Sequence, residues 1–277
     1  MKYSALGILS LSLILNACHS ESKNALPQDS VKTVVDSSTV ISADDLVKSE
    51  APDALTKTEQ GYALPRNDGG KTQSPINILS DSAIKEINQP VDVKFNTKIV
   101  AVENLGHTIQ VDFQDGSTVI AGGRTYQTKQ FHFHTPSEHL IDGVTYPLEM
   151  HIVSVLQDSN SQHNPHYLVV GLLFKMGHEN KFIKEFLNAI PQEEKKDTLT
   201  AAVRFEDLFD PIPKNESSAY YTYPGSLTTP PYSETVTWMV RKYILEASPE
   251  QIYALEKAEG NNARHVQALF GRRVLNH

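Results

Sequence analysis

Three histidines in the middle of the sequence have the spacing of metal ligands. His132 and His134 are separated by one residue, and His151 follows them after a short connection. Side chains alternate along a β-strand, so His132 and His134 point to the same face, where a histidine on a neighbouring strand can meet them. Neutral imidazole suits zinc, and a catalytic zinc site takes three protein ligands and leaves one position for water. The residues therefore indicate a metal site, although an isolated His-x-His pair is also common at ordinary surface and core positions.

β-Strands are the elements that must position these histidines, and the sequence is rich in strand patterns. The stretch from Tyr167 to Phe174 is apolar on both faces, which predicts a strand in the middle of a sheet that is buried on both sides. A turn signal at Asp142-Gly143 predicts an antiparallel return that places His151 opposite the other two histidines. Strands bounded by Gly, Asp, Asn and Pro turns are expected at residues 91–95, 108–113, 128–134, 149–155, 167–174 and 234–240.

Only two helices are expected. An apolar stripe from Phe182 to Ile190 has helical spacing and is stopped by Pro191. The segment Ser248-Pro-Glu-Gln251 is a capping box with proline at the first helical position, and the helix that it opens should end near Gly260. We therefore predict a mainly β (α+β) fold, a single domain around a large central, mostly antiparallel, twisted β-sheet with a few short peripheral helices.

Composition and charge exclude some partners. The chain has 277 residues, of which 39% are hydrophobic and 21% charged, and its formal net charge is -8. These values are typical of one soluble globular domain with an appendage. The negative balance and the lack of a Lys/Arg cluster argue against nucleic acid or an anionic membrane surface as a partner. The sequence does not determine the oligomeric state.

The N-terminal segment resembles the signal of a bacterial lipoprotein. Lys2 precedes an apolar run from Ala5 to Leu15, which is too short to span a bilayer and predicts a signal peptide. Leu15-Asn16-Ala17-Cys18 resembles the lipobox, whose cysteine is lipidated and becomes the first mature residue. The alternative is a conventional cleavage site beside which Cys18, the one cysteine of the chain, happens to fall.

This interpretation divides the chain into three parts. Residues 1–17 are expected to be the lipoprotein-type signal peptide, and residues 18–58 a flexible tether that starts at the lipidated Cys18. The tether has no aromatic residue and no sustained apolar period, so burial cannot offset its ordering entropy. Residues 59–277 form the predicted folded domain. We expect the protein to be exported and lipid-anchored, at the outer membrane facing the periplasm of a Gram-negative bacterium.

Longer motifs around the histidines resemble those of the α-class carbonic anhydrases, and they follow the family's order from about Gly61 to Val274. The resemblance implies that Zn²⁺ is bound by His132, His134 and His151. It also implies reversible hydration of CO2 to bicarbonate and a proton, by attack of a zinc-bound hydroxide on CO2 in an apolar pocket. The motifs are Gln-Ser-Pro-Ile-Asn-Ile at 73–78, Asn-Leu-Gly-His at 104–107, Gln-Phe-His-Phe-His-Thr-Pro-Ser-Glu-His at 130–139, Glu-Met-His at 149–151 and Tyr-Pro-Gly-Ser-Leu-Thr-Thr-Pro-Pro at 223–231.

The resemblance implies roles for two polar residues beside the histidines. Gln130 and Glu149 match the family's hydrogen-bond partners of His132 and His151, which fix the tautomer of each imidazole and raise its basicity. Each lies two residues before its histidine, hence on the same face of the strand. Two polar strand residues on a solvated face are the alternative. His139 is expected to be a buried structural partner of Glu149 and not a ligand.

Further residues match the family's catalytic pocket. Thr228 matches a threonine whose hydroxyl accepts from the zinc hydroxide and donates to a buried carboxylate, here Glu138. Thr229 is its neighbour at the pocket mouth, and both threonines, beside two prolines, could instead be plain turn residues. His107 matches the proton shuttle, for which histidine has a suitable unperturbed pKa, and a bystander histidine is the alternative. Apolar residues that an ordinary β core would also contain match the pocket wall: Val153, Val169, Leu227, Val236 and Trp238.

The sequence also departs from the family. Many exported bacterial members carry a disulfide between a cysteine before the Gly-Lys-x-Gln-Ser-Pro segment and one directly after the two prolines. Arg66–Lys71 and Tyr232 occupy these places here, so we expect lower heat tolerance than in disulfide-bearing relatives. The family's aromatic entry is reduced to Gly61-Tyr62, which leaves the role of Tyr62 open.

Three other functions compete with CO2 hydration. A catalytically silent binding module is known in this superfamily where a zinc ligand has been replaced, but all three ligands are intact here. A zinc-dependent esterase would use the same hydroxide on activated carbonyls. A purely structural zinc site would use four protein ligands, and no fourth is evident. The ligand set thus favours a carbonic anhydrase whose partner is a small molecule, CO2 or bicarbonate.

Overall fold

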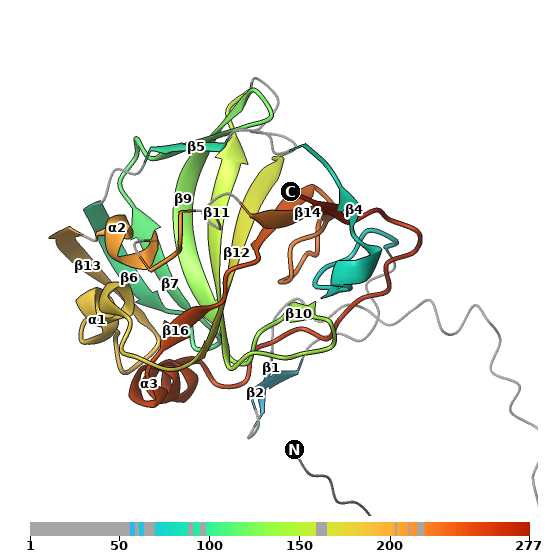
Figure 1. Ribbon diagram of the computed structural model, residues 1–277. Helices are drawn as coiled ribbons and strands as arrows, with labels where there is room; N and C mark the ends of the chain where they lie inside the picture. The colour runs from blue at the N-terminus through green and yellow to red at the C-terminus, as the bar shows by residue number, and fades with distance from the viewer. Residues whose placement is uncertain are drawn as a thin grey trace, which may run out of the picture. The chain divides into compact units, whose positions relative to one another are not determined.

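A computed structural model of the chain describes residues 56–58, 61–63, 70–87, 91–94, 98–158, 165–202, 204–209, 211–214 and 219–277 (Figure 1). The predicted signal peptide, Cys18 and the predicted tether up to residue 55 lie outside these residues. No helix within the described ranges is both long and apolar enough to cross a membrane. β1 (Thr56–Thr58) pairs antiparallel with β2 (Gly61–Ala63), across the predicted boundary between tether and domain.

A 13-stranded mixed sheet is the main element of the described chain. Most neighbouring strands are antiparallel, but β12 runs parallel to β15 and β16, and β17 runs parallel to β4. A separate parallel pair is formed by β3 (Asn77–Ile78) and β10 (Leu140–Ile141). The strands of the large sheet are β4 (Ile84–Lys85), β5 (Val91–Lys94), β6 (Lys98–Asn104), β7 (Ile109–Phe113), β8 (Thr118–Ala121), β9 (Arg124–His134), β11 (Leu148–Leu156), β12 (Tyr167–Met176), β13 (Lys195–Ala202), β14 (Tyr220–Gly225), β15 (Val236–Arg241), β16 (Leu245–Ala247) and β17 (Leu275–Asn276).

β9, β11 and β12 lie side by side in the interior of this sheet (Figure 1). The predicted turn between β9 and β11 is present, with positive φ angles of 51° at Asp142 and 80° at Gly143. The two strands are antiparallel, and His151 lies directly opposite His132, as predicted. β12 is paired with β11 on one side and with β15 on the other, which confirms the interior strand expected from its apolar sequence.

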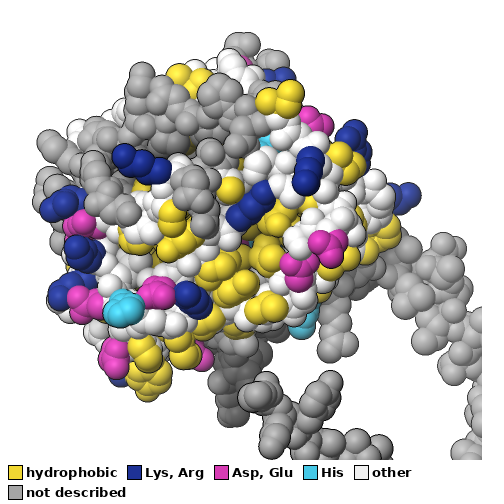
Figure 2. Space-filling model, in the orientation of Figure 1, with side chains coloured by type: hydrophobic (Ala, Val, Ile, Leu, Met, Phe, Trp, Pro, Cys, Tyr) yellow, Lys and Arg dark blue, Asp and Glu magenta, His cyan; other side chains and the backbone are white. Residues whose placement is uncertain are grey.

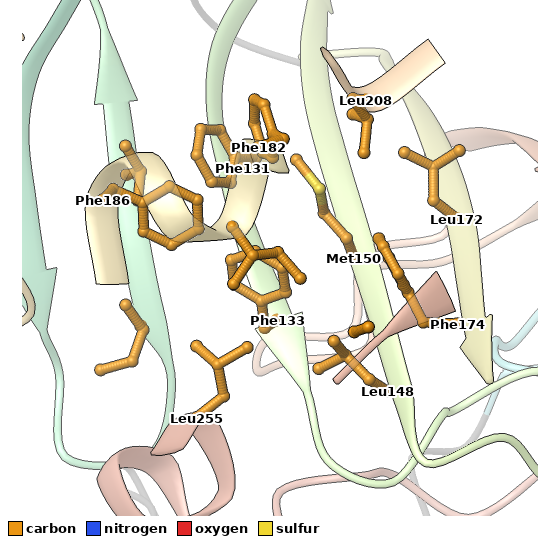
Figure 3. Packing of buried hydrophobic residues seen from close by; sticks show 14 of the residues in the cluster. Phe131, Phe133, Leu148, Met150, Leu172, Phe174, Phe182, Phe186, Leu208 and Leu255 are labelled. Carbon is orange, nitrogen blue, oxygen red and sulfur yellow. The ribbon is translucent and has the colours of Figure 1, made fainter. Parts of the chain in front are cut away.

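The helices pack on one face of β9. Phe131 and Phe133 point to that face and contact Phe182 and Phe186 of α1, with ring centroids 5.3 to 5.6 Å apart (Figure 3). Residues of all three α-helices join the same buried cluster. The alternation of β9 then sends His132 and His134 to the opposite face. The helices are η1 (Ser80–Ser82, a 3-10 turn), α1 (Lys181–Leu187), α2 (Phe205–Phe209) and α3 (Pro249–Glu259).

The predicted fold class is confirmed. The capping box that opens α3 is present, since Ser248 Oγ accepts from Gln251 N at 3.3 Å and Gln251 Oε1 accepts from Ser248 N at 3.1 Å. α1 is shorter than its apolar stripe suggested, because the chain turns after Leu187. On the face shown in Figure 2, basic and acidic side chains are interspersed with apolar ones. That face therefore carries charges of both signs.

Candidate metal centre

β9 and β11 bring the three predicted ligands together. The ligand atoms of His132, His134 and His151 all lie within 4.8 Å of one another. The ring centroids are 5.1 Å apart for the pair on β9, and 5.2 and 4.6 Å from those two rings to His151. His134 and His151 are buried, and His132 is half-buried. The arrangement comes from strand alternation on β9 and from the antiparallel register with β11.

Hydrogen bonds determine which nitrogen of two histidines faces the centre. His132 Nδ1 donates to Gln130 Oε1 at 2.9 Å, and His151 Nε2 donates to Glu149 Oε1 at 2.8 Å. A neutral imidazole has one N–H, so the other nitrogen, Nε2 of His132 and Nδ1 of His151, keeps its lone pair. Gln130 and Glu149 therefore make the contacts that were predicted for them, and both histidines are prepared as metal ligands.

His134 shows most directly that the site fits a metal ion. Both of its ring nitrogens are buried, and neither meets a hydrogen-bond partner in acceptable geometry within the described residues, although the main chain of Asn262 lies close enough to affect its pKa. A buried polar group without a partner is costly, and a coordinated ion would satisfy it. Burial lowers the pKa of all three histidines below the ordinary value, with their mutual repulsion adding to the effect at His132 and His134. The rings are thus neutral near pH 7, as zinc ligation requires.

Glu149 is the centre of the hydrogen-bond network behind His151. Its Oε2 accepts the main-chain N–H groups of Glu138 and His139, both at 2.8 Å, and its Oε1 accepts His139 Nδ1 at 2.7 Å. His139 Nε2 lies 2.6 Å from the Tyr223 hydroxyl, so the network continues into the core. Burial alone would raise the pKa of Glu149, but His139 and His151 hold it well below its usual value. His139 is therefore a structural partner of Glu149, as expected.

Thr228 and Glu138 meet beside the histidines, as predicted. Both side chains are buried, at 5% and 1% exposure. Burial and the nearby Glu149 raise the pKa of Glu138 well above its usual value, while the main-chain N–H of Arg264 and the Thr228 hydroxyl, which both donate to the carboxyl group, oppose this. Glu138 Oε2 is 3.5 Å from His134 Nε2. The pair therefore lies directly against the metal centre.

The predicted apolar wall is also brought together. Val153, Val169, Val236 and Trp238 are buried members of one cluster, and Leu227 packs against it half-buried. The Trp238 ring lies 4.7 Å from the ring of His151, centroid to centroid. The wall therefore lies beside the ligand on β11. Thr229 is half-buried in the turn that follows, where its carbonyl accepts the N–H of Tyr232 at 2.9 Å.

His107 lies in the loop between β6 and β7 and is half-buried. Its Nδ1 donates to the carbonyl of Leu105 at 3.0 Å. Burial lowers the pKa of His107, and the Leu105 carbonyl and the charge of Glu194 oppose that shift. Charge repulsion from His107 makes a small contribution to the lowered pKa of His132.

Three residues near the centre were given no role from the sequence. Arg264 N donates to Glu138 Oε1 at 3.0 Å, and Asn262 Oδ1 accepts the N–H of Thr135 at 3.0 Å. Glu259 is a buried acid at the end of α3. Its burial was foreseeable, since Glu259 follows the buried Ile252 and Leu255 at helical spacing. The contacts of Arg264 and Asn262 span more than a hundred residues, and no local pattern indicates them.

The fold and the site define a mainly β protein with a three-histidine candidate metal centre on two interior strands. Comparison with known proteins identifies the family of the chain. Residues 59–277 match the family model described as eukaryotic-type carbonic anhydrase. The chain therefore belongs to the eukaryotic-type, or α-class, carbonic anhydrases and is classed as an enzyme with them.

Bacterial relatives support this assignment. The chain is 38% identical over 211 residues to a carbonic anhydrase of Neisseria gonorrhoeae, covering 74% of this chain and 77% of the relative. It is 35% identical over 208 residues to a carbonic anhydrase of Pectobacterium carotovorum, covering 74% and 80%. Among solved structures, it matches the α-carbonic anhydrase of Thermovibrio ammonificans in complex with the inhibitor sulfanilamide. That match has a TM-score of 0.67 and 40% identity, and covers 74% of this chain and 87% of the other.

Proposed function

We propose that this protein catalyses the reversible hydration of CO2 to bicarbonate and a proton, with a zinc ion held by His132, His134 and His151. The observation that carries the proposal is the convergence of three neutral imidazoles, two of them oriented by Gln130 and Glu149. In carbonic anhydrases, where this property is established, zinc lowers the pKa of a bound water to about 7 and so supplies a nucleophile at neutral pH.

Thr228 and Glu138 orient the reacting oxygen. A hydroxyl group has one proton, and the Thr228 hydroxyl uses it to donate a hydrogen bond to the Glu138 carboxyl group. The oxygen of Thr228 can then only accept a hydrogen bond from whatever occupies the position beside the histidines. This arrangement selects a group that still carries a proton and disfavours anions that carry none.

The apolar wall is proposed to hold the substrate, and His107 to remove the proton that the reaction releases. CO2 is apolar, so it needs a dry surface and no charged clamp, and the cluster of Val153, Val169, Val236 and Trp238 supplies that surface. The half-buried His107 is the group that we propose to accept the proton released in each turnover and to pass it to buffer. Its lowered pKa favours rapid release of the proton near neutral pH.

The test combines metal analysis with a stopped-flow assay of CO2 hydration on the purified protein. We expect an equimolar content of zinc and an activity that a chelator removes and added zinc restores. His151→Ala should abolish zinc binding and activity together. A zinc-loaded wild-type protein without hydration activity would instead support the silent binding module, and full activity in His151→Ala would refute the ligand assignment.

We also propose that the protein is exported and anchored through a lipid on Cys18, at the outer membrane facing the periplasm. The lipobox-like segment Leu15–Cys18 supports this proposal. Labelled fatty acid should enter the wild-type chain in a bacterial host but not Cys18→Ser, and membrane fractions should contain only the wild type. Equal labelling of both chains would exclude this attachment site.

A further inference from the structure

Glu259 is a buried acid that the proposed mechanism does not use. It is the last residue of α3 and is 1% exposed. Within the part of the chain that the structure describes, no basic side chain forms an ion pair with it. The carboxyl end of a helix carries partial negative charge, so an ionised carboxylate is disfavoured there. Glu259 therefore occupies a position where the un-ionised acid is the stable form.

The hydrogen-bond distances around Glu259 also favour a proton on it. The Thr135 hydroxyl lies 2.8 Å from the carbonyl of Gly260 and 3.3 Å from Glu259 Oε1. A hydroxyl has a single proton, and a carbonyl can only accept, so the shorter contact uses the proton of Thr135. A proton on Glu259 Oε1 makes the longer contact a second full hydrogen bond, in which Glu259 donates to the free lone pair of Thr135. Glu259 Oε2 meanwhile accepts the N–H of Ile109 at 3.2 Å.

The balance of charge agrees with this proton count. Burial raises the pKa of Glu259 to about 8, and the N–H of Ile109, which donates to Oε2, opposes the shift only in part. Three titratable residues lie close in sequence to Glu259 or to the residues that it contacts. They are His107 on the β6–β7 loop, His134 on β9 and Arg264, which follows α3. None of these contributes to the shift. Glu259 is thus a neutral carboxylic acid at neutral pH and becomes a carboxylate above about pH 8.

The end of α3 connects the two places between which a proton must move. Thr135 directly follows the ligand His134, and Ile109 lies two residues after His107. Asn262, which follows α3, links the same two segments. Its Nδ2 donates to the carbonyl of His107 at 2.7 Å and to that of Phe133 at 3.1 Å. Glu259 and Asn262 therefore hold the strand of the metal ligands and the loop of His107 against each other.

We propose that Glu259, as an un-ionised acid, is a positioning residue that fixes the distance between the metal centre and the His107 loop for proton transfer. This inference rests on the proposed function, since it assigns a task to the proton exit of that reaction. When Glu259 ionises, it can no longer donate to Thr135, and its charge lies at the unfavourable end of α3. The end of α3 then holds β9 and the His107 loop less firmly against each other. Proton transfer through His107 slows, although the metal site stays intact.

Two substitutions separate this role from general stability. Glu259→Gln keeps both hydrogen bonds without a titratable group, because its amide donates to Thr135 and its carbonyl accepts from Ile109. Glu259→Leu removes both. Glu256→Gln is the matched control, since it makes the same chemical change at an exposed position of the same helix. Each variant is assayed for zinc content and for kcat and kcat/KM of CO2 hydration across the pH range.

We expect kcat of the wild type and of Glu256→Gln to decline above about pH 8, and kcat of Glu259→Gln not to decline there. Glu259→Leu should lose about tenfold in kcat, with kcat/KM and zinc content nearly unchanged, because a small displacement of the shuttle affects proton transfer alone. An infrared difference spectrum between wild type and Glu259→Gln should show a protonated carboxyl band at neutral pH that disappears at alkaline pH.

The inference is overturned if Glu259→Gln keeps the alkaline decline of the wild type, or if the infrared band of a protonated carboxyl is absent at neutral pH. It is also overturned if Glu259→Leu loses kcat/KM and zinc in parallel with kcat, since the role would then be structural support of the metal site. A wild-type protein without zinc or without hydration activity would refute the proposed function first. Should Glu259→Leu fail to fold, the comparison of Glu259→Gln with Glu256→Gln still decides.

Discussion

The positions of single protons on the side chains determine which atoms at this centre can bind a metal. The single N–H of His132 and of His151 is held by Gln130 and Glu149, which leaves the opposite nitrogen for a metal. The carboxyl groups nearby differ in charge for local reasons. Two histidines stabilise the carboxylate of Glu149, whereas burial raises the pKa of Glu138 and that of Glu259. Substitutions of Glu149 and of Glu259 are therefore expected to have different effects.

Removal of the charge on Glu149 should weaken metal binding. Glu149→Gln replaces one carboxylate oxygen by an NH2 group. Two donors meet at each oxygen of Glu149, two main-chain N–H groups at Oε2 and two histidines at Oε1, so two of the four lose their acceptor. We expect zinc affinity to fall by about 10- to 100-fold, measured by competition with a chromophoric chelator. Glu246→Gln is the matched control, because Glu246 Oε2 accepts from His178 Nδ1 at 2.7 Å on the exposed surface. Equal losses in the two variants would contradict the prediction.

Glu259 should make stability depend on pH in a defined window. Its pKa is about 8 in the folded chain and near 4.5 when exposed, so the folded state holds the proton more tightly. Stability conferred by this proton is complete below pH 4.5 and is lost as pH rises to about 8. Glu259→Gln should therefore be more stable than the wild type by an amount that grows through this window and then levels off. At about 1.4 kcal/mol per pH unit, the difference is at most about 5 kcal/mol.

Denaturant unfolding at a series of pH values checks this, with zinc loading kept constant. Glu256→Gln should follow the wild type throughout. A constant difference between Glu259→Gln and the wild type across the window would show that the folded chain does not hold a proton there.

At the scale of elements, β9 serves the core and the site at once. Phe131 and Phe133 fill the cluster under the helices (Figure 3). His132 and His134 alternate with them along the strand and therefore lie on its other face. A slip of one residue in the register of β9 would bury the histidines under the helices and expose the aromatic rings. The aromatic side therefore fixes the register that the metal site needs.

Phe131→Ala tests this coupling. Phe131 contacts the rings of Phe113, Phe133, Phe182 and Phe186 within 5.8 Å between centroids, so truncation leaves a cavity. We expect a loss of about 3 to 5 kcal/mol in the free energy of unfolding, together with weaker zinc binding. Tyr253→Ala, at a residue 66% exposed on α3, should change neither. A destabilised Phe131→Ala that keeps wild-type zinc affinity would show that the core does not set the geometry of the ligands.

The sequence predicted the elements whose pattern is local, and missed those that depend on partners. The strands at β7, β9, β11, β12 and β15 were expected from apolar patterns. β14 was not, because its segment includes Pro224 and Gly225, and its pairing with β15 and β17 compensates for them. Spacing indicated that the three histidines could meet, and the longer motifs around them implied that they are ligands. Arg264 was not, since its contact with Glu138 joins residues 126 positions apart and only the folded chain shows it.

For the whole molecule, the proposed zinc ion would supply the stabilisation that disulfides give to many small domains. The chain has one cysteine and so cannot form an internal disulfide. A ligand that binds only the folded state stabilises it by mass action, by about 2.7 kcal/mol at a free concentration 100 times Kd. We therefore expect zinc to raise Tm by about 5 to 10 °C at that concentration, and a non-chelating reductant to leave Tm unchanged.

Thermal unfolding with zinc, with chelator and with reductant measures these effects. His151→Ala provides the control, because its Tm should not respond to zinc. A Tm that falls with the reductant, or that ignores zinc in the wild type, would contradict this view of the molecule.

The interior position of β9 and β11 also has a kinetic consequence. β11 is hydrogen-bonded to a strand on each side over most of its length, and β9 is paired at His132 with both β7 and β11. Such amide groups exchange with solvent only when the sheet opens as a whole. The three ligands should therefore separate only in rare global openings, so a bound ion would be released on the timescale of unfolding and not on that of loop motion. Amide hydrogen exchange at these strands and the rate of zinc loss to a chelator should then share one temperature dependence.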